Sequence, residues 1–143
     1  MKKRSISGLL ALVLLACITQ AATVKEVPMK GSGSGQITGQ NGAVITAIGE
    51  GEATHLGKFT REEVITLNDG AVSGTIVFTA ADGSQLNCEF VGAFTSATTV
   101  AGTYTFTGGT GRFDGASGGT FFNITLGEAG SFSFGFAGTI EMN

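Results

Sequence analysis

The stretch SFSFGFAGTIE, Ser131–Glu141, decides the fold class of this chain. Every second residue from Phe132 to Ile140 is apolar or glycine, and the residues between them are small or polar. Successive side chains of a β-strand point to opposite faces, so this alternation places one apolar face against one wet face. The stretch therefore predicts a strand that is buried on one side and solvated on the other.

Seven other stretches have the same character and are separated by turn signals such as QNG, NDG and ADG. No window shows sustained apolar spacing of three and four, so we expect no long helix beyond the N-terminal segment. Eight such strands suit closure into a small antiparallel barrel, because closure removes exposed sheet edges. The expected strands are residues 34–40, 43–54, 58–67, 71–80, 84–94, 99–107, 118–126 and 131–141.

The composition points to an interior packed with rings. Among 143 residues there are 24 Gly and 11 Phe but one Tyr and no Trp, and only 13% are charged. Any cavity left between the rings should be narrow and apolar, without a place for a buried charge. Tyr104 and Cys88 are the only reactive groups expected inside. The expected cavity-lining residues are Phe78, Cys88, Phe90, Tyr104, Phe106, Phe122, Phe132, Phe134 and Phe136.

The N-terminus has the pattern of an export signal. MKKR precedes an apolar run, residues 6–16, that is too short to span a membrane. LLAC, residues 14–17, resembles a lipobox, which predicts cleavage before Cys17 and its lipidation; cleavage after Ala21 or Ala22 is the other route. Both routes predict a periplasmic or extracellular protein, with a membrane anchor only if Cys17 is lipidated. We assign residues 1–21 to the signal peptide, 22–35 to a flexible tether and 36–143 to the barrel.

Loss of the signal leaves five basic residues against eleven acidic ones, a formal net charge of −6. No basic run survives, which argues against nucleic acid as a partner. Cys88 would have no intramolecular partner, so the chain is not a disulfide-stapled scaffold. Stability must come from the core.

A glycine-rich stretch, FTGGTGRFDGASGG (Phe106–Gly119), does not fit a phosphate-binding loop. Asp114 occupies the place of the third glycine of a dinucleotide fingerprint, and a strand is expected to follow. A phosphate loop of the Walker type needs a lysine, and none occurs after Lys58. We therefore expect no cofactor.

Three further residues favour structural roles. His55 lies at odd spacing from Glu52, which is wrong for a shared metal ion on one strand face, and we expect it to stabilise a turn. Cys88 has only Glu89 as a charged neighbour in sequence, so we expect an inert, buried thiol. Arg112 and Asp114 are expected to form a local ion pair.

The stretch YTFTGGTGRFDGASGG resembles a signature of the allene oxide cyclase and dirigent-like superfamily. GEATHLGKFT (51–60) and FTAADGSQLNCEF (78–90) are similar to secreted bacterial members, and the resemblance spans about residues 49–141. Glycines at such positions permit positive φ and close strand approach, and Phe113 is expected to plug one barrel end. The signature residues are Gly108, Gly109, Thr110, Gly111, Arg112 and Phe113.

The resemblance implies an eight-stranded antiparallel barrel with a central cavity, and a homo-oligomer, because plant members are often trimers. Allene oxide cyclases are isomerases acting on a fatty-acid epoxide, and dirigent proteins steer the coupling of phenoxy radicals. The polar cavity residues of neither group have matching positions in this sequence. Our leading prediction is therefore an exported, non-enzymatic barrel that binds a small apolar ligand or has a structural role. An isomerase or cyclase is the alternative, and two or more inward ionisable groups at one level would favour it.

Overall fold

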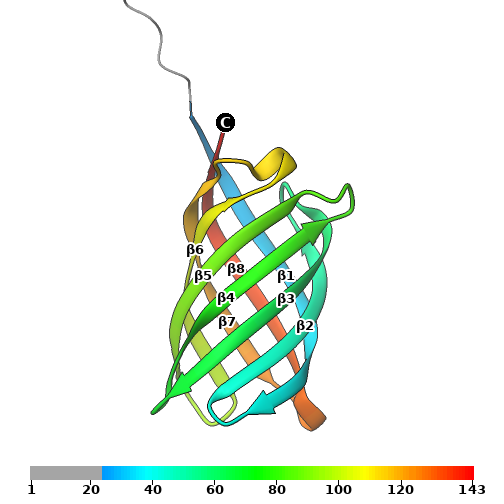
Figure 1. The fold of residues 1–143 in the computed structure, drawn as a ribbon. Helices are drawn as coiled ribbons and strands as arrows, with labels where there is room; N and C mark the ends of the chain where they lie inside the picture. Colours follow the sequence, from blue (N-terminus) through cyan, green and yellow to red (C-terminus); the bar gives the residue numbers. More distant parts are fainter. Residues whose placement is uncertain (1–23) are drawn as a thin grey trace, which may run out of the picture.

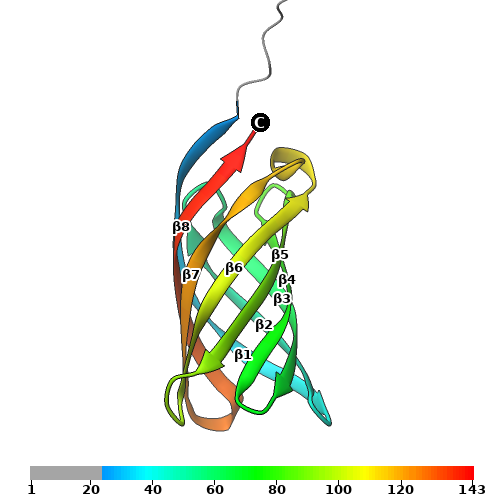
Figure 2. The ribbon, with the colours of Figure 1, turned by 90° about the vertical axis from the view of Figure 1, so that its left-hand side faces the viewer.

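A computed structural model describes residues 24–143 of the chain. The expected signal peptide and the lipidation of Cys17 lie outside the described residues. Eight strands form one closed antiparallel barrel in which each strand pairs with the next and β8 pairs with β1 (Figures 1 and 2). The predicted fold class is therefore confirmed. The strands are β1 (Lys25–Asn41), β2 (Val44–Ala53), β3 (Gly57–Asn68), β4 (Ala71–Ala80), β5 (Gln85–Phe94), β6 (Thr99–Gly109), β7 (Ser117–Leu126) and β8 (Ser131–Met142).

Helical structure in residues 24–143 is limited to two single turns of 3₁₀-helix, η2 (Gly111–Phe113) and η3 (Glu128–Gly130). The expectation of no long helix holds for this part of the chain. None of the helices described there has the length and apolar character needed to cross a membrane.

The flexible tether expected over residues 22–35 is wrong from Lys25 onward, because β1 begins there and pairs with β8 as far as Gln36. The Gly-Ser alternation is a strand pattern in which the serines face solvent and the glycines face the barrel interior. A Cβ atom at Gly33 would lie 2.6 Å from Cζ of Phe134 and 2.1 Å from the carbonyl oxygen of Glu50. The glycines thus leave room for the rings of β8. The pairs in register are Gly31 with Phe136, Gly33 with Phe134 and Gly35 with Phe132.

The interior is a continuous cluster of aromatic rings. All nine side chains expected inside the barrel are buried. Tyr104 stacks on Phe122 with ring centroids 4.6 Å apart, and Phe59 meets Phe78 edge-on at 5.2 Å. Such contacts add to the stabilisation from burying each ring, which is about 1.5–3 kcal/mol.

One end of the barrel is closed by the glycine-rich connection between β6 and β7. Phe113 in η2 is fully buried there, as predicted, and Leu56 from the β2–β3 hairpin is buried at the same end. Arg112 ties the loops together: its Nε donates to Asp82 at 2.8 Å and its Nη1 donates to the carbonyl of His55 at 2.6 Å. The expected pairing of Arg112 with Asp114 is therefore wrong, because the β4–β5 turn brings Asp82 beside the guanidinium.

Two glycines of the signature meet the backbone demands of this closure in different ways. Gly111 has a φ of +58°, in the left-handed region that disfavours a side chain. Gly109 is in ordinary strand geometry, but a Cβ atom there would lie 2.0 Å from the carbonyl oxygen of Gln85. Positive φ and close approach, both expected from the sequence, are thus divided between two residues.

Candidate functional site: a buried ion pair beside an apolar cavity

Strand β3 carries two charged residues into the barrel. Arg61 and Glu63 share the inward parity of Phe59, and they are 1% and 4% exposed. In the register with β2, Arg61 lies opposite Gly49 and Glu63 lies opposite Ala47. These small partners leave interior space for the two long charged side chains.

Arg61 is held at the centre of a small polar cluster. Its Nη1 donates a hydrogen bond to the hydroxyl of Tyr104 at 2.9 Å, and its guanidinium carbon lies 3.8 Å from the ring centroid of Phe134. Its Nη2 lies 2.6 Å from Oε2 of Glu63. This ion pair is close but poorly aligned for hydrogen bonding, so Nε and Nη2 of Arg61 and Oε2 of Glu63 lack well-directed partners. A buried charge pair with unmet hydrogen-bonding capacity contributes little net stability.

Burial shifts the protonation of the cluster. It raises the pKa of Glu63 above 4.5, although the positive charge of Arg61 opposes the change. Burial also raises the pKa of Tyr104 to about 12, again against the effect of Arg61. The carboxyl of Glu63 is thus easier to protonate than a surface carboxyl, and the phenol of Tyr104 stays neutral at physiological pH.

A cavity of about 120 Å³ adjoins Glu63 at the end of the barrel opposite Phe113. Glu63 is its only charged or polar lining residue; the other eleven are aliphatic or Phe. Phe94, which the sequence placed inside, is 38% exposed at this end. The lining residues are Ile37, Ile45, Glu63, Ile65, Leu67, Val72, Phe90, Phe94, Val100, Ile124, Leu126 and Phe132.

The structure separates the expected lining residues into two groups. Phe90 and Phe132 line the cavity, and Tyr104 belongs to the polar cluster beside it. Cys88 is buried, and burial raises its pKa to about 12, so an inert thiol is confirmed. The remaining Phe residues pack within the aromatic core.

Sequence reasoning missed Arg61 and Glu63 and expected no buried charge. The expectation is wrong because an inward strand face was identified by its apolar residues alone. One signal was present: in KFTREEVITL, the residues Phe59, Arg61, Glu63, Ile65 and Leu67 have the same parity. A strand with Phe, Ile and Leu on one parity must bring charges of that parity inside as well.

The signature residues Gly108–Phe113 lie at the closed end, away from the cavity. His55 is also there, at the tip of the β2–β3 hairpin with a φ of +66°, and it contributes its main-chain carbonyl to Arg112. Among residues 24–143, no three His, Cys, Asp or Glu side chains gather where they could share a metal ion.

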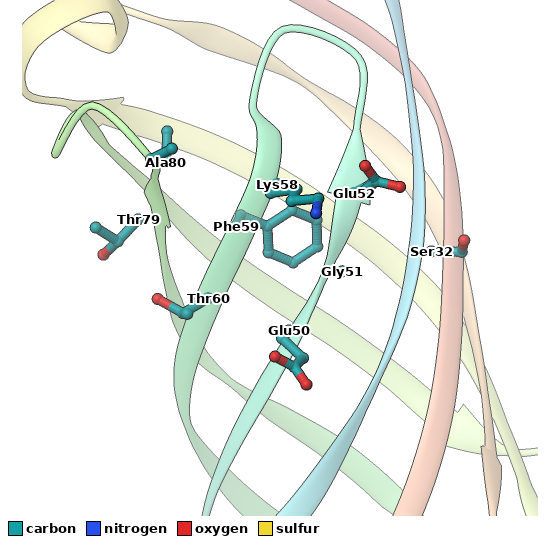
Figure 3. A pocket seen from close by; sticks show the side chains of 10 residues that line it. Ser32, Glu50, Gly51, Glu52, Lys58, Phe59, Thr60, Thr79 and Ala80 are labelled. Carbon is teal, nitrogen blue, oxygen red and sulfur yellow. The ribbon is translucent and has the colours of Figure 1, made fainter.

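A wider hollow lies on the outer wall, where β1 to β4 carry Ser32, Glu50, Glu52, Lys58 and Thr79 (Figure 3). It is an open groove of about 580 Å³, and Figure 3 shows Glu50 and Glu52 on β2 beside Lys58 on β3. All these side chains are partly or fully exposed, and no buried, unpartnered group is among them. The interior cavity is therefore the stronger candidate, because it combines enclosure, apolar walls and a perturbed carboxyl.

Comparison with known proteins identifies the fold. A scan against protein-family models found no match, and a search of curated proteins found none either. Among solved structures, the pterocarpan synthase dirigent protein GePTS1 matches with a TM-score of 0.57 and 12% identity, covering 87% of this chain and 89% of that one. The pterocarpan synthase dirigent protein PsPTS1 matches with a TM-score of 0.54 and 11% identity, covering 87% and 98%. The chain thus has the barrel of the allene oxide cyclase and dirigent-like group, as the resemblance implied.

Proposed function

We propose that the barrel is a binding module that takes one small, largely apolar molecule into the cavity beside Glu63. The observation that carries this proposal is the cavity itself, with eleven apolar lining residues and one buried carboxyl. Its size is close to that of the engineered cavity of about 150 Å³ that binds benzene in another protein. The ligand class supported is therefore a single ring or a short branched chain, with one group that hydrogen-bonds to Glu63.

The dirigent proteins of similar fold lend support to a module that holds a molecule rather than transforming it. The likeness extends to the fold only, at 12% and 11% identity. The ligand class thus rests on the residues of this chain.

The test is a matched pair of probes, toluene and p-cresol, which differ by one hydroxyl. We expect calorimetric titration to detect both, with p-cresol binding more tightly through Glu63. Glu63→Gln should bring the two affinities closer together, and Ile65→Phe should fill the cavity and abolish binding. Ile48→Phe, on the outer wall of β2, is the control for added ring area. Equal binding by the Ile65→Phe variant would contradict the proposal.

An acid–base isomerase is the second candidate, and a specific observation favours it. Arg61, Glu63 and Tyr104 are three ionisable groups brought together inside the barrel, which meets the criterion set from the sequence. Glu63 could remove a proton next to a carbonyl, return it two carbons away, and leave Arg61 to stabilise the enolate oxygen. The conversion of cyclohex-3-enone to cyclohex-2-enone, followed by ultraviolet absorbance, tests this in a molecule of suitable size. A rate above background that is lost in Glu63→Gln would favour the enzyme; binding without turnover favours the module.

We also propose that the chain works outside the cytoplasm, on the strength of the export pattern in residues 1–22. Mass spectrometry of the mature N-terminus tests this and separates the two routes. A diacylglycerol-modified Cys17 indicates a lipid-anchored protein, and a free N-terminus at Ala22 or Thr23 indicates a released one. An intact N-terminal segment after expression in a secreting host would overturn export.

A further inference from the structure

Charge is distributed unevenly around the outer wall of the barrel. The outward positions of β1, β2 and β3 carry six charged side chains: Glu26, Lys30, Glu50, Glu52, Lys58 and Glu62. Those of β5 to β8 carry two, Glu89 and Glu141. Figure 2 shows these last four strands side by side on the side facing the viewer. We call the outer wall of β5–β8 the uncharged face. Depletion of charge is what distinguishes the centre of a protein interface from ordinary surface.

The uncharged face carries two strongly exposed apolar side chains. Phe121 on β7 is 75% exposed and Val91 on β5 is 60% exposed, more than any other large hydrophobic residue of the described chain. Both pair in register with Thr103 of β6, so they lie in one cross-strand row. Two strand spacings put them about 10 Å apart.

The same face also has a hollow that fits the projecting ring. A shallow groove of about 300 Å³ runs beside Val91, between the outer side chains of Ser73, Thr75, Glu89 and Thr105. A ring that projects and a groove that receives one therefore lie on one surface, a short distance apart. A two-fold axis between them would place each ring in the other copy's groove.

We propose that a second copy of this chain packs on the uncharged face, with Phe121 of each copy entering the groove beside the partner's Val91. Residues 24–143 have a formal net charge of −6. Two copies joined in this way turn their charged walls away from each other, which minimises repulsion. The partner's Glu89 would then lie near Phe121, and this gives the test a signed prediction.

The experiment is sedimentation velocity of the full chain and three variants. We expect the wild type to form a dimer, and Phe121→Glu to raise the dimer Kd at least about tenfold, as expected for a buried aromatic at an interface centre. Phe121→Lys should weaken the dimer less than Phe121→Glu does, because lysine can pair with the partner's Glu89. Ile48→Glu places the same new charge on the outer wall of β2 and should leave the dimer unchanged.

Several results would overturn the proposal. One is a wild-type chain that stays monomeric up to about 1 mM, where even weak pairs associate. Another is a dimer or larger assembly that is indifferent to Phe121→Glu. Equal weakening by Glu and Lys would contradict the two-fold placement beside Glu89, and a closed trimer would do the same. Circular dichroism melting of each variant separates loss of association from loss of the fold.

Discussion

At the scale of single residues, Glu63 carries the most information about function. It is a buried carboxyl at the edge of an apolar cavity, paired with Arg61 at 2.6 Å but short of good hydrogen bonds. Such an arrangement is a poor way to stabilise a barrel, and apolar residues of similar volume would serve as well or better. Its presence therefore supports a role in contacting a ligand.

Glu63 should make stability depend on pH in a definite direction. Burial raises its pKa above 4.5 in the folded chain, so the folded state binds the proton more tightly than the unfolded state. The contribution is fully present below pH 4.5 and is lost as pH rises through the folded-state pKa. Each pKa unit of difference is worth about 1.4 kcal/mol.

The measurement is the free energy of unfolding in urea between pH 4 and 8, for the wild type and for Glu63→Gln. We expect the wild type to lose stability relative to the variant as pH rises, because glutamine cannot ionise. Glu62→Gln, on the exposed side of the same strand, is the control. Two parallel stability curves for the wild type and Glu63→Gln would show that Glu63 has no raised pKa.

Cys88 should be nearly unreactive in the folded chain. Burial raises its pKa to about 12, so only about one thiol in ten thousand is a thiolate at pH 8. We expect alkylation by iodoacetamide to be slow under native conditions and fast in urea. Peptide mapping measures the label on Cys88 separately from any label on Cys17. Rapid native labelling would contradict the buried placement.

At the scale of elements, β1 and β3 show where sequence patterns mislead. The other strands were recognised because Phe, Leu and Ile alternate with polar residues. In β1 the inward positions from Gly31 to Gly35 are glycine, and composition alone cannot distinguish such a strand from a linker. The rings of β8 that require these glycines are a hundred residues away in sequence. In β3 the inward charges broke the apolar alternation.

The only proline has an edge role that its sequence context did not reveal. β1 extends beyond β2, and Lys30 directs its main-chain carbonyl toward Thr54 of the β2–β3 turn. Pro28 has the same parity as Lys30, so it lies where β1 has an open edge. A residue without an N–H group discourages another strand from pairing there.

Gly33→Val tests whether β1 is a structural strand. The new side chain would clash with Phe134 and with the carbonyl of Glu50, so we expect a loss of about 1–3 kcal/mol or more from overpacking. Ser34→Val places the same side chain on the exposed face and should change stability by less than about 0.5 kcal/mol. Chemical denaturation of both variants decides the matter. A flexible tether would tolerate the two substitutions equally.

At the scale of the whole molecule, the barrel has two unlike ends. The glycine-rich signature, Phe113 and the Arg112 bridges close one end, and the cavity occupies the other. The sequence predicted the closed end well, because turns and glycines are local features. It could not predict the cavity, which is lined by residues from seven strands and appears only when all of them close.

This division predicts that stability and binding can be altered separately. Phe113 is fully buried at the closed end, so Phe113→Ala should cost about 3–5 kcal/mol in unfolding free energy. Because Phe113 does not line the cavity, p-cresol affinity at a temperature where the variant is folded should stay within about twofold of the wild type, the small effect expected at an independent site. Phe94 is 38% exposed and lines the cavity, so Phe94→Ala should cost much less stability and weaken binding more. Urea denaturation and calorimetric titration of both variants provide the two measurements. If Phe113→Ala weakened binding while Phe94→Ala left it intact, the ligand would bind at the other end, and the cavity beside Glu63 would not be the site.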